Sequence, residues 1–441
     1  MRYQITSDST CDLSPEQLER YNIRLLPLYV SMDGKTLRDG VDVKPDDIYA
    51  HVSAGGSLPQ TAAVNLADYV RAFTELSAKN DFVIHVCISL DFSCCYQNAK
   101  LAAADFDNVY VVDSRNLSTG HGLVVLEAER MAREGMEPDA VIAGNGASEL
   151  IWAALLALRT RGARRVLFLG PLFVQYARAC AALGMETEQV LCPEDDSFLP
   201  DAAALDGVAR SGADVVIVCS PNNPGTGILR DFSPLLDAVG RRVLLLDASY
   251  RGFLPEGDPG ALPYPSLAGE AERNGAVLIL LDSMTKFFCC PGVRLGFAVA
   301  EAELVARMDA CRPSWSVGTA AESAGLALLE HEAEYRALLP ELAQGVEAVA
   351  GHLEESGLFR RVLRGPSFVI AALRNGDAAD MQARLLRREG VMIRACDNIP
   401  GMPEGWVRIQ VRPERHMQRL YAGLKHLQGT LSPGLLHAAF A

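Results

Sequence analysis

The feature that most constrains the fold is an alternation of short apolar runs with amphipathic stretches along most of the 441 residues. The apolar runs are rich in Val, Ile and Leu and occupy residues 82–88, 109–112, 165–169, 215–219, 243–246 and 277–281. Stretches such as 177–184 and 231–239 fit amphipathic helices. Strands that alternate with helices predict an α/β fold with mainly parallel sheets covered on both faces.

The pattern changes after about residue 300. Residues 301–349 are rich in Ala, Leu and Glu and predict long helices, whereas 359–427 mix helices with strands at 368–373 and 407–411. A weak boundary lies at 135–138, and the uncharged end of the chain is expected to fray. We therefore expect three folded parts, 1–136, 137–330 and 331–429, and a tail at 430–441, in keeping with about 150 residues per domain.

Composition excludes several classes of protein. The net charge of −14 disfavours nonspecific binding to nucleic acid, which needs a basic surface. No apolar run reaches the roughly 18 residues of a membrane span, and the N-terminus has no apolar core of a secretory signal. The 11 cysteines include no CxxC pair, so we expect neither a disulfide framework nor a metal site, and a cytoplasmic location.

Residues 282–296, DSMTKFFCCPGVRLG, are the most informative for chemistry. Lys286 follows a strand and two hydroxyl residues; taken alone, such a lysine is usually a surface residue. Upstream, Asp247 ends an apolar strand, with Tyr250 three residues later. The segment CSPNNPGTG at 219 also lies at a strand end, and GNGASE at 144 opens a helix. Ligands of open α/β sheets bind at the carboxyl ends of strands, so these four segments can converge there.

Residues 139–428 resemble fold type I pyridoxal-phosphate enzymes, closest to histidinol-phosphate aminotransferases and threonine-phosphate decarboxylases. The resemblance is carried by GNGASE at 144, PLFVQY at 171, SPNNP at 220, DASY at 247, SMTKFFCCPGVRLGF at 283 and WVRIQVR at 406. It implies a large domain with a mainly parallel sheet, a small C-terminal α+β domain and pyridoxal 5'-phosphate as cofactor.

The resemblance also implies roles for single residues. Lys286 would join the cofactor aldehyde and then move the α-proton, and Asp247 would pair with the protonated ring nitrogen. Tyr250 and Asn223 would hydrogen-bond the ring 3-oxygen, and Phe173 would stack on the ring. Outside this pattern, each of these residues has an ordinary structural reading, such as a turn or core packing.

The phosphate of the cofactor would be held at a helix N-terminus, where free amides favour anions. The resemblance assigns this task to Ala147, Ser148, Ser283 and Arg294. The loop after Asn223 departs from the family, because PNNPTG is here PNNPGTG.

Arg408 matches the family arginine that pairs with the substrate carboxylate. Arg412 comes four residues later on the same predicted strand, and the side-chain period of two places both on one face. Two cations suit a substrate with two anionic groups, such as a phosphorylated amino acid. Transamination and decarboxylation of such an amino acid both remain open.

The first 136 residues resemble the first lobe of the DegV family of fatty-acid-binding proteins. The matching segments are SDSTCDL at 7, LPLYVSMDGKTLRDGVD at 26, LPQTAAVN at 58, ISLDFSCCYQNA at 88 and VVDSRNLSTGHG at 111. The resemblance implies that Thr61 and Ser93 bind a lipid carboxylate; the alternative is that they cap helices. A lipid carrier with a vestigial enzyme half is thus a third hypothesis.

Both halves look incomplete by comparison with their families. No second DegV lobe follows the first, and the sequence leaves no room for the N-terminal arm and opening helix that precede GNGASE in the pyridoxal enzymes. The resemblance also implies a homodimer.

Overall fold

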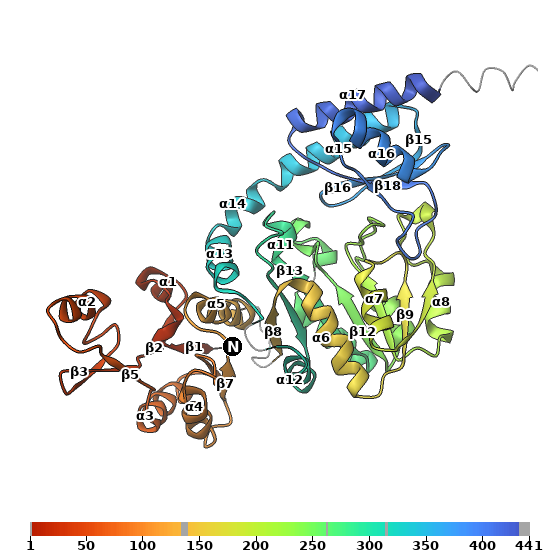
Figure 1. Cartoon of the computed structure of the whole chain (residues 1–441). Coiled ribbons are helices and arrows are strands. Elements are labelled where there is room, and N and C mark those ends of the chain that lie inside the picture. The colour runs from red at the N-terminus through yellow and green to blue at the C-terminus, as the bar shows by residue number, and fades with distance from the viewer. Residues whose placement is uncertain (1, 134–139, 262, 314–315, 432–441) are drawn as a thin grey trace, which may run out of the picture. The chain divides into compact units, whose positions relative to one another are not determined.

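The computed structural model describes residues 2–133, 140–261, 263–313 and 316–431 (Figure 1). The chain divides into two compact units. The first contains Met1–Glu149 and Cys290–His331, and the second contains Leu150–Cys289 and Glu332–Ala441. Strands alternate with helices in both units, so the predicted α/β class is confirmed. The boundary expected at 135–138 lies outside the described residues.

A parallel sheet with the strand order β2-β1-β6-β7 forms the centre of the first unit. Its strands are β1 (Tyr3–Asp8), β2 (Ile23–Leu26), β6 (Phe82–Cys87) and β7 (Val109–Asp113). Helices α3 (Leu66–Ser77) and α4 (Cys95–Ala103) cover one face, and α5 (Thr119–Arg133) covers the other (Figure 1). Every residue of β6 is buried, as expected for a strand with both faces covered.

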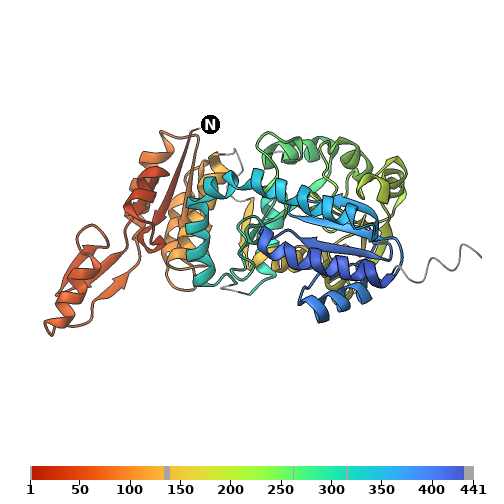
Figure 2. The ribbon, with the colours of Figure 1, turned by 90° about the horizontal axis from the view of Figure 1, so that it is seen from above.

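The same unit carries a small antiparallel sheet with the order β4-β3-β5. It consists of β3 (Tyr29–Met32), β4 (Lys35–Arg38) and β5 (Gln60–Ala62), with α2 (Pro45–Ser53) between the last two. In Figure 2 this sheet and α2 project from the parallel sheet as an arm. Near its base, α1 (Pro15–Arg20) starts with a capping box between Ser14 and Gln17.

Helix α5 is covered on two faces. On one face, a Cβ at Gly122 would lie 2.4 Å from the Cys11 carbonyl oxygen, in the turn η1 (Ser9–Cys11). On the other, α5 packs against α13 (Thr319–Glu330), and both views show the two helices side by side (Figures 1 and 2). A Cβ at Gly325 of α13 would come within 2.9 Å of the Leu123 side chain. Helix α5 is therefore buried on almost all sides and packs between the parallel sheet and α13.

The rest of the first unit pairs β8 (Val141–Gly144) with β14 (Gly296–Ala300) in antiparallel fashion. Helix α12 (Ala302–Ala310) follows β14, and its Asp309 forms an ion pair with Arg115 at 2.7 Å.

The second unit contains a parallel sheet in which β10, β9, β11, β12 and β13 are neighbours in that order. These strands are β9 (Arg165–Leu169), β10 (Glu186–Val190), β11 (Val215–Cys219), β12 (Val243–Asp247) and β13 (Val277–Ser283). The intervening helices and turns are α6 (Gly146–Thr160), α7 (Gln175–Ala182), η2 (Glu194–Asp196), α8 (Ala202–Arg210), α9 (Ser233–Val239), η3 (Arg251–Phe253), η4 (Pro259–Ala261), α10 (Tyr264–Asn274) and α11 (Met284–Phe287). Helix α6 begins within the first unit and continues in the second.

An antiparallel sheet of order β15-β16-β18-β17 lies in the C-terminal part. Its strands are β15 (Phe359–Arg364), β16 (Phe368–Leu373), β17 (Arg394–Ala395) and β18 (Trp406–Gln410). Helices α14 (Glu332–Ala337), α15 (Leu339–Glu355), α16 (Ala378–Glu389) and α17 (Glu414–Leu431) complete this part. The sheet shares one apolar core with α15, α16 and α17.

Fraying from residue 430 was expected too early, because α17 continues to Leu431; residues 432–441 lie outside the description. Among the helices described, none combines the length and the apolar character needed to cross a membrane.

Candidate active site

Three neighbouring strands of the second unit end in register. Cys219 of β11 pairs with Asp247 of β12, and Asp247 pairs with Leu281 of β13. The segments that follow these strands carry Asn223, Tyr250 and Lys286 respectively. Because parallel strands end at the same edge of a sheet, these segments emerge together, at the edge where open α/β sheets bind ligands.

Asp247 is a buried carboxylate with a fixed orientation. The Tyr176 hydroxyl donates to its Oδ2 at 2.7 Å, and the Ser249 amide donates to its Oδ1 at 2.9 Å. Burial, together with the carboxylate, raises the pKa of Tyr176 well above its ordinary value, so the phenol remains a donor. Sequence reasoning missed Tyr176, although it closes the motif PLFVQY.

Tyr250 is buried just after β12 and remains protonated at neutral pH. Burial raises its pKa to about 12, although the nearby Arg408 opposes this shift. Its ring stacks on Phe253 and meets Phe368 edge-on, with centroid distances of 5.9 and 5.6 Å. The phenol is therefore a neutral donor on a ring that packing holds in place.

Arg408 of β18 contacts the loop after β11. Its guanidinium donates to Asn223 Oδ1 and lies over the Phe368 ring, 5.4 Å from the centroid. With its amide oxygen occupied, Asn223 keeps its NH2 group to donate elsewhere. No local sequence pattern predicts this pair, whose members are far apart along the chain.

The prediction that Arg412 lies on the same strand as Arg408 was wrong. Strand β18 ends at Gln410; the next amide, Val411, makes one further bond in the same register, to the Ser367 carbonyl at 3.1 Å. Arg412 is exposed in the segment before Pro413 and α17. Proline cannot donate to a sheet ladder, which is consistent with this early end.

Lys286 is exposed in the short helix α11, which directly follows β13. Ser283, the last residue of β13, is buried, and its Oγ lies 2.8 Å from Thr285 Oγ1. Phe173 lies between β9 and α7 and is 42% exposed, which is unusual for a ring whose only task is to fill a core.

In the first unit, Arg294 lies against the start of α6. Gly146 has φ +72°, and a Cβ there would sit 2.4 Å from Arg294 Nη2, so only glycine permits this approach. Ala147 and Ser148 follow in the first turn of α6, where amides lack helical partners. Arg294 is exposed and also donates to the Pro291 carbonyl at 3.0 Å. A guanidinium beside a helix N-terminus is suited to an anion.

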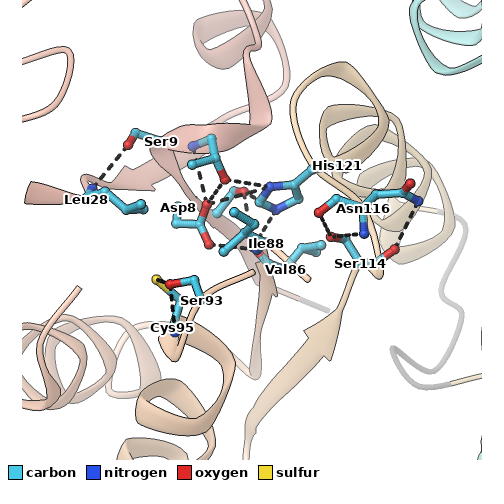
Figure 3. Close-up of polar contacts among 12 residues, drawn as sticks. Asp8, Ser9, Leu28, Val86, Ile88, Ser93, Cys95, Ser114, Asn116 and His121 are labelled. Atoms are coloured by element: carbon cyan, nitrogen blue, oxygen red, sulfur yellow. Dashed lines mark hydrogen bonds and ion pairs between the residues drawn. The ribbon is translucent and has the colours of Figure 1, made fainter. Parts of the chain in front are cut away.

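The two residues expected to bind lipid have different surroundings. Thr61 is exposed on β5, opposite Val30 of β3, and is not a helix cap. The Ser93 Oγ accepts from the Cys95 amide at 3.3 Å at the start of α4 and lies 3.2 Å from the Cys95 sulfur (Figure 3). The N-cap of α4 is Cys94, so neither Thr61 nor Ser93 is a helix cap, although Ser93 accepts from the amide of the first residue of α4.

Comparison with known proteins divides the chain in two. Residues 2–144 match the model of the DegV family, described as uncharacterised proteins, and residues 98–424 match that of the class I and II aminotransferases. Threonine-phosphate decarboxylase of Salmonella typhimurium is 29% identical over 313 residues, covering 69% of this chain and 82% of the relative. A DegV domain-containing protein of Caldanaerobacter subterraneus is 33% identical over 140 residues, covering 31% of this chain and 50% of the relative. The chain thus spans about half the length of the DegV relatives that it matches.

A solved structure with the same fold is the histidinol-phosphate aminotransferase of Clostridium acetobutylicum. Its TM-score is 0.58 at 23% identity, covering 69% of this chain and 90% of that one.

The two family matches overlap at residues 98–144, which include α5 and β8. The aminotransferase match thus begins before GNGASE and includes α5, a helix that also packs on the DegV-like sheet. The chain joins a DegV-family segment to an enzyme part, and it belongs to the class I and II aminotransferases, a family of pyridoxal-phosphate-dependent enzymes.

Proposed function

We propose that the chain is a transaminase that acts on an amino acid, with Lys286 as the amine that binds pyridoxal phosphate. The observation that carries this proposal is Asp247, a buried carboxylate oriented by two donors. It lies at the strand edge from which the Lys286 segment also emerges. Such a carboxylate is the partner that a protonated pyridine nitrogen needs.

The donors on this chain fit the cofactor. Bound pyridoxal phosphate supplies an electron sink for the α-carbon of an amino acid. Asp247 holds the proton on the ring nitrogen, and the neutral Tyr250 phenol and the Asn223 NH2 group donate to the ring oxygen. Phe173 offers an exposed aromatic face for stacking.

We assign the phosphate to Ala147, Ser148, Ser283 and Arg294. The support is the close approach of Arg294 to Gly146, which adds a cation where the first amides of α6 are free. The Ser283 hydroxyl can add a neutral donor.

Lys286 acts as base and acid at the α-carbon when its amine is free of the cofactor. Arg408 binds the substrate carboxylate, oriented by its contact with Asn223 and Phe368. Arg412 binds a second anionic group of the substrate. Its exposure beyond the end of β18 leaves its long side chain able to reach such a group.

Decarboxylation of a phosphorylated amino acid is the second candidate, because the similarity to threonine-phosphate decarboxylase extends over 82% of that relative. The test incubates the reconstituted chain with amino and phosphoamino acids, with and without a 2-keto acid. Transamination predicts amino-group transfer that requires the keto acid. Carbon dioxide release without a keto acid would refute transamination and support decarboxylation.

We further propose that the DegV-like segment binds a fatty acid through Thr61 and Ser93, that the enzyme is a homodimer, and that it works in the cytoplasm. The DegV match and the two hydroxyls support the first proposal. Organic extraction of the purified chain, followed by mass spectrometry, tests it; absence of fatty acid after incubation with oleate would contradict it. Sedimentation analysis tests the dimer, and fractionation of cells tests the location.

A further inference from the structure

Three side chains that can bind metals lie close together at the C-terminal ends of β1 and β6. Asp8, His85 and Cys87 each offer one ligand atom, and these atoms all lie within 4.8 Å of one another. Thr6 pairs with His85, so Asp8 comes level with Cys87 two residues later. The side-chain period of two therefore directs all three to the same face of the sheet.

This face is closed to solvent. Asp8, His85 and Cys87 are each 0% exposed. Tyr69 and Phe73 of α3 lie against the His85 ring, with centroid distances of 5.0 and 5.6 Å. The cluster thus differs from the exposed acidic groups that gather on many protein surfaces without binding anything.

Two buried polar atoms at this place have no partner among the described residues. The His85 Nδ1 contacts Thr6 Oγ1 at 2.8 Å, but its Nε2 has no hydrogen bond, and neither has the Tyr69 hydroxyl. Leaving a buried polar atom unpaired destabilises the fold, because its hydrogen bonds with water are lost without replacement. An ion or molecule bound in the cluster would give these two atoms a partner and so remove that destabilisation.

The ion-pair partner of the Asp8 carboxylate is a histidine. Asp8 accepts from the Ile88 amide at 2.8 Å and from the Thr10 hydroxyl at 2.5 Å. The Nδ1 atom of the equally buried His121 lies 3.6 Å from Asp8 Oδ1 (Figure 3), and no lysine or arginine of the described chain pairs with this carboxylate. Burying a carboxylate is costly, and a divalent ion beside it would offset that cost.

We propose that Asp8, His85 and Cys87 form a binding site for a divalent transition metal of the zinc type. One imidazole nitrogen, one sulfur and one carboxylate oxygen are a ligand set that zinc accepts. Binding requires the thiolate, so the Cys87 proton leaves to solvent as the metal–sulfur bond forms. Tetrahedral zinc ligands lie about 3.4 Å apart. Ligand atoms that are up to 4.8 Å apart must therefore move closer together on binding.

A metal site was not expected from the sequence, because its cysteines include no CxxC pair and no His-rich ligand spacing. Asp8 is distant in sequence from the His85-x-Cys87 pair, and only the pairing of β1 with β6 unites them. A buried water molecule in the same place would also satisfy His85 and Tyr69, so the test must separate water from metal.

The test equilibrates the full chain with zinc, removes free ion by gel filtration and measures metal by mass spectrometry. We expect about one zinc per chain, and a higher melting temperature with zinc than with a chelator. His85→Gln and Cys87→Ser should each reduce the zinc content at least tenfold. Cys180→Ser, at a cysteine of α7 that is equally buried but outside the cluster, should leave it unchanged.

Cobalt provides a readout that does not depend on stability. The cobalt-loaded chain should show a thiolate charge-transfer band in the near ultraviolet, absent from Cys87→Ser. Wild-type protein with less than about 0.1 zinc per chain would overturn the proposal, as would zinc retained in both ligand variants. If the variants fail to fold, the wild-type zinc content and cobalt spectrum still decide the question.

Discussion

The substitution Gly146→Ala adds one carbon atom beside Arg294 and thereby tests whether this arginine holds the cofactor phosphate. Gly146 has φ +72°, and the added Cβ would lie 2.4 Å from Arg294 Nη2. The backbone strain costs about 1–2 kcal/mol. In addition, Arg294 must move away, and losing its charge-assisted hydrogen bond to a phosphate costs about 1.5–3 kcal/mol. We therefore expect cofactor to bind about 10- to 100-fold more weakly.

Gly184→Ala is the matched control. Gly184 also has a positive φ, +61°, but nothing lies within 4 Å of its Cβ position. Both variants should lose similar stability in urea unfolding, whereas only Gly146→Ala should weaken cofactor binding in an absorbance titration. Equal cofactor affinity in Gly146→Ala, Gly184→Ala and wild type would refute the role of Arg294.

Three further predictions follow from single contacts. Tyr176→Phe removes the hydroxyl that donates to Asp247 Oδ2 and should weaken cofactor binding about tenfold in the same absorbance titration. The control Tyr421→Phe removes a buried hydroxyl that has no partner among the described residues and should leave cofactor binding unchanged. Equal losses of affinity in the two variants would contradict the role of Tyr176. Burial lowers the pKa of His85 to about 4 from its ordinary 6.5, so in chelator-treated protein the unfolded chain takes up the proton first as pH falls. The free energy of unfolding, measured with urea, should therefore drop by up to about 3 kcal/mol between pH 6.5 and 4, and His85→Gln should lack this drop. Wild type and variant with the same dependence of stability on pH would contradict the prediction. Arg412→Ala should reduce kcat/KM for phosphoamino acids about tenfold and leave neutral amino acids unchanged, with Arg415→Ala as the control; an unchanged preference would show that Arg412 does not touch substrate.

Several strands were predictable because each is a short apolar run between turn residues, whereas the polar parallel strand β10 was not predicted. Strands β9, β11 and β16 have the predicted bounds. The segments around Asp247 and Lys286 were predictable because they directly follow such strands, and residue order along the chain is enough to place them at a strand end.

Contacts between distant segments were not predictable. Tyr176 and Asp247 meet only because β9 and β12 belong to one sheet, and Arg408 and Asn223 only because β18 comes near the loop after β11. No local pattern records either pair. The double role of α5 was missed because its sequence carries charged residues, such as Glu127 and Arg130, like an ordinary surface helix, whereas the structure buries it on almost all sides.

The most direct measurement reduces the cofactor-loaded chain with borohydride and locates the cofactor by peptide mass spectrometry. The account predicts one cofactor mass per chain, fixed to Lys286, and loss of the visible absorbance band in Lys286→Ala but not in Lys425→Ala, an exposed lysine of α17. Folded protein that retains no cofactor, or that carries it on another lysine, would contradict the central claim.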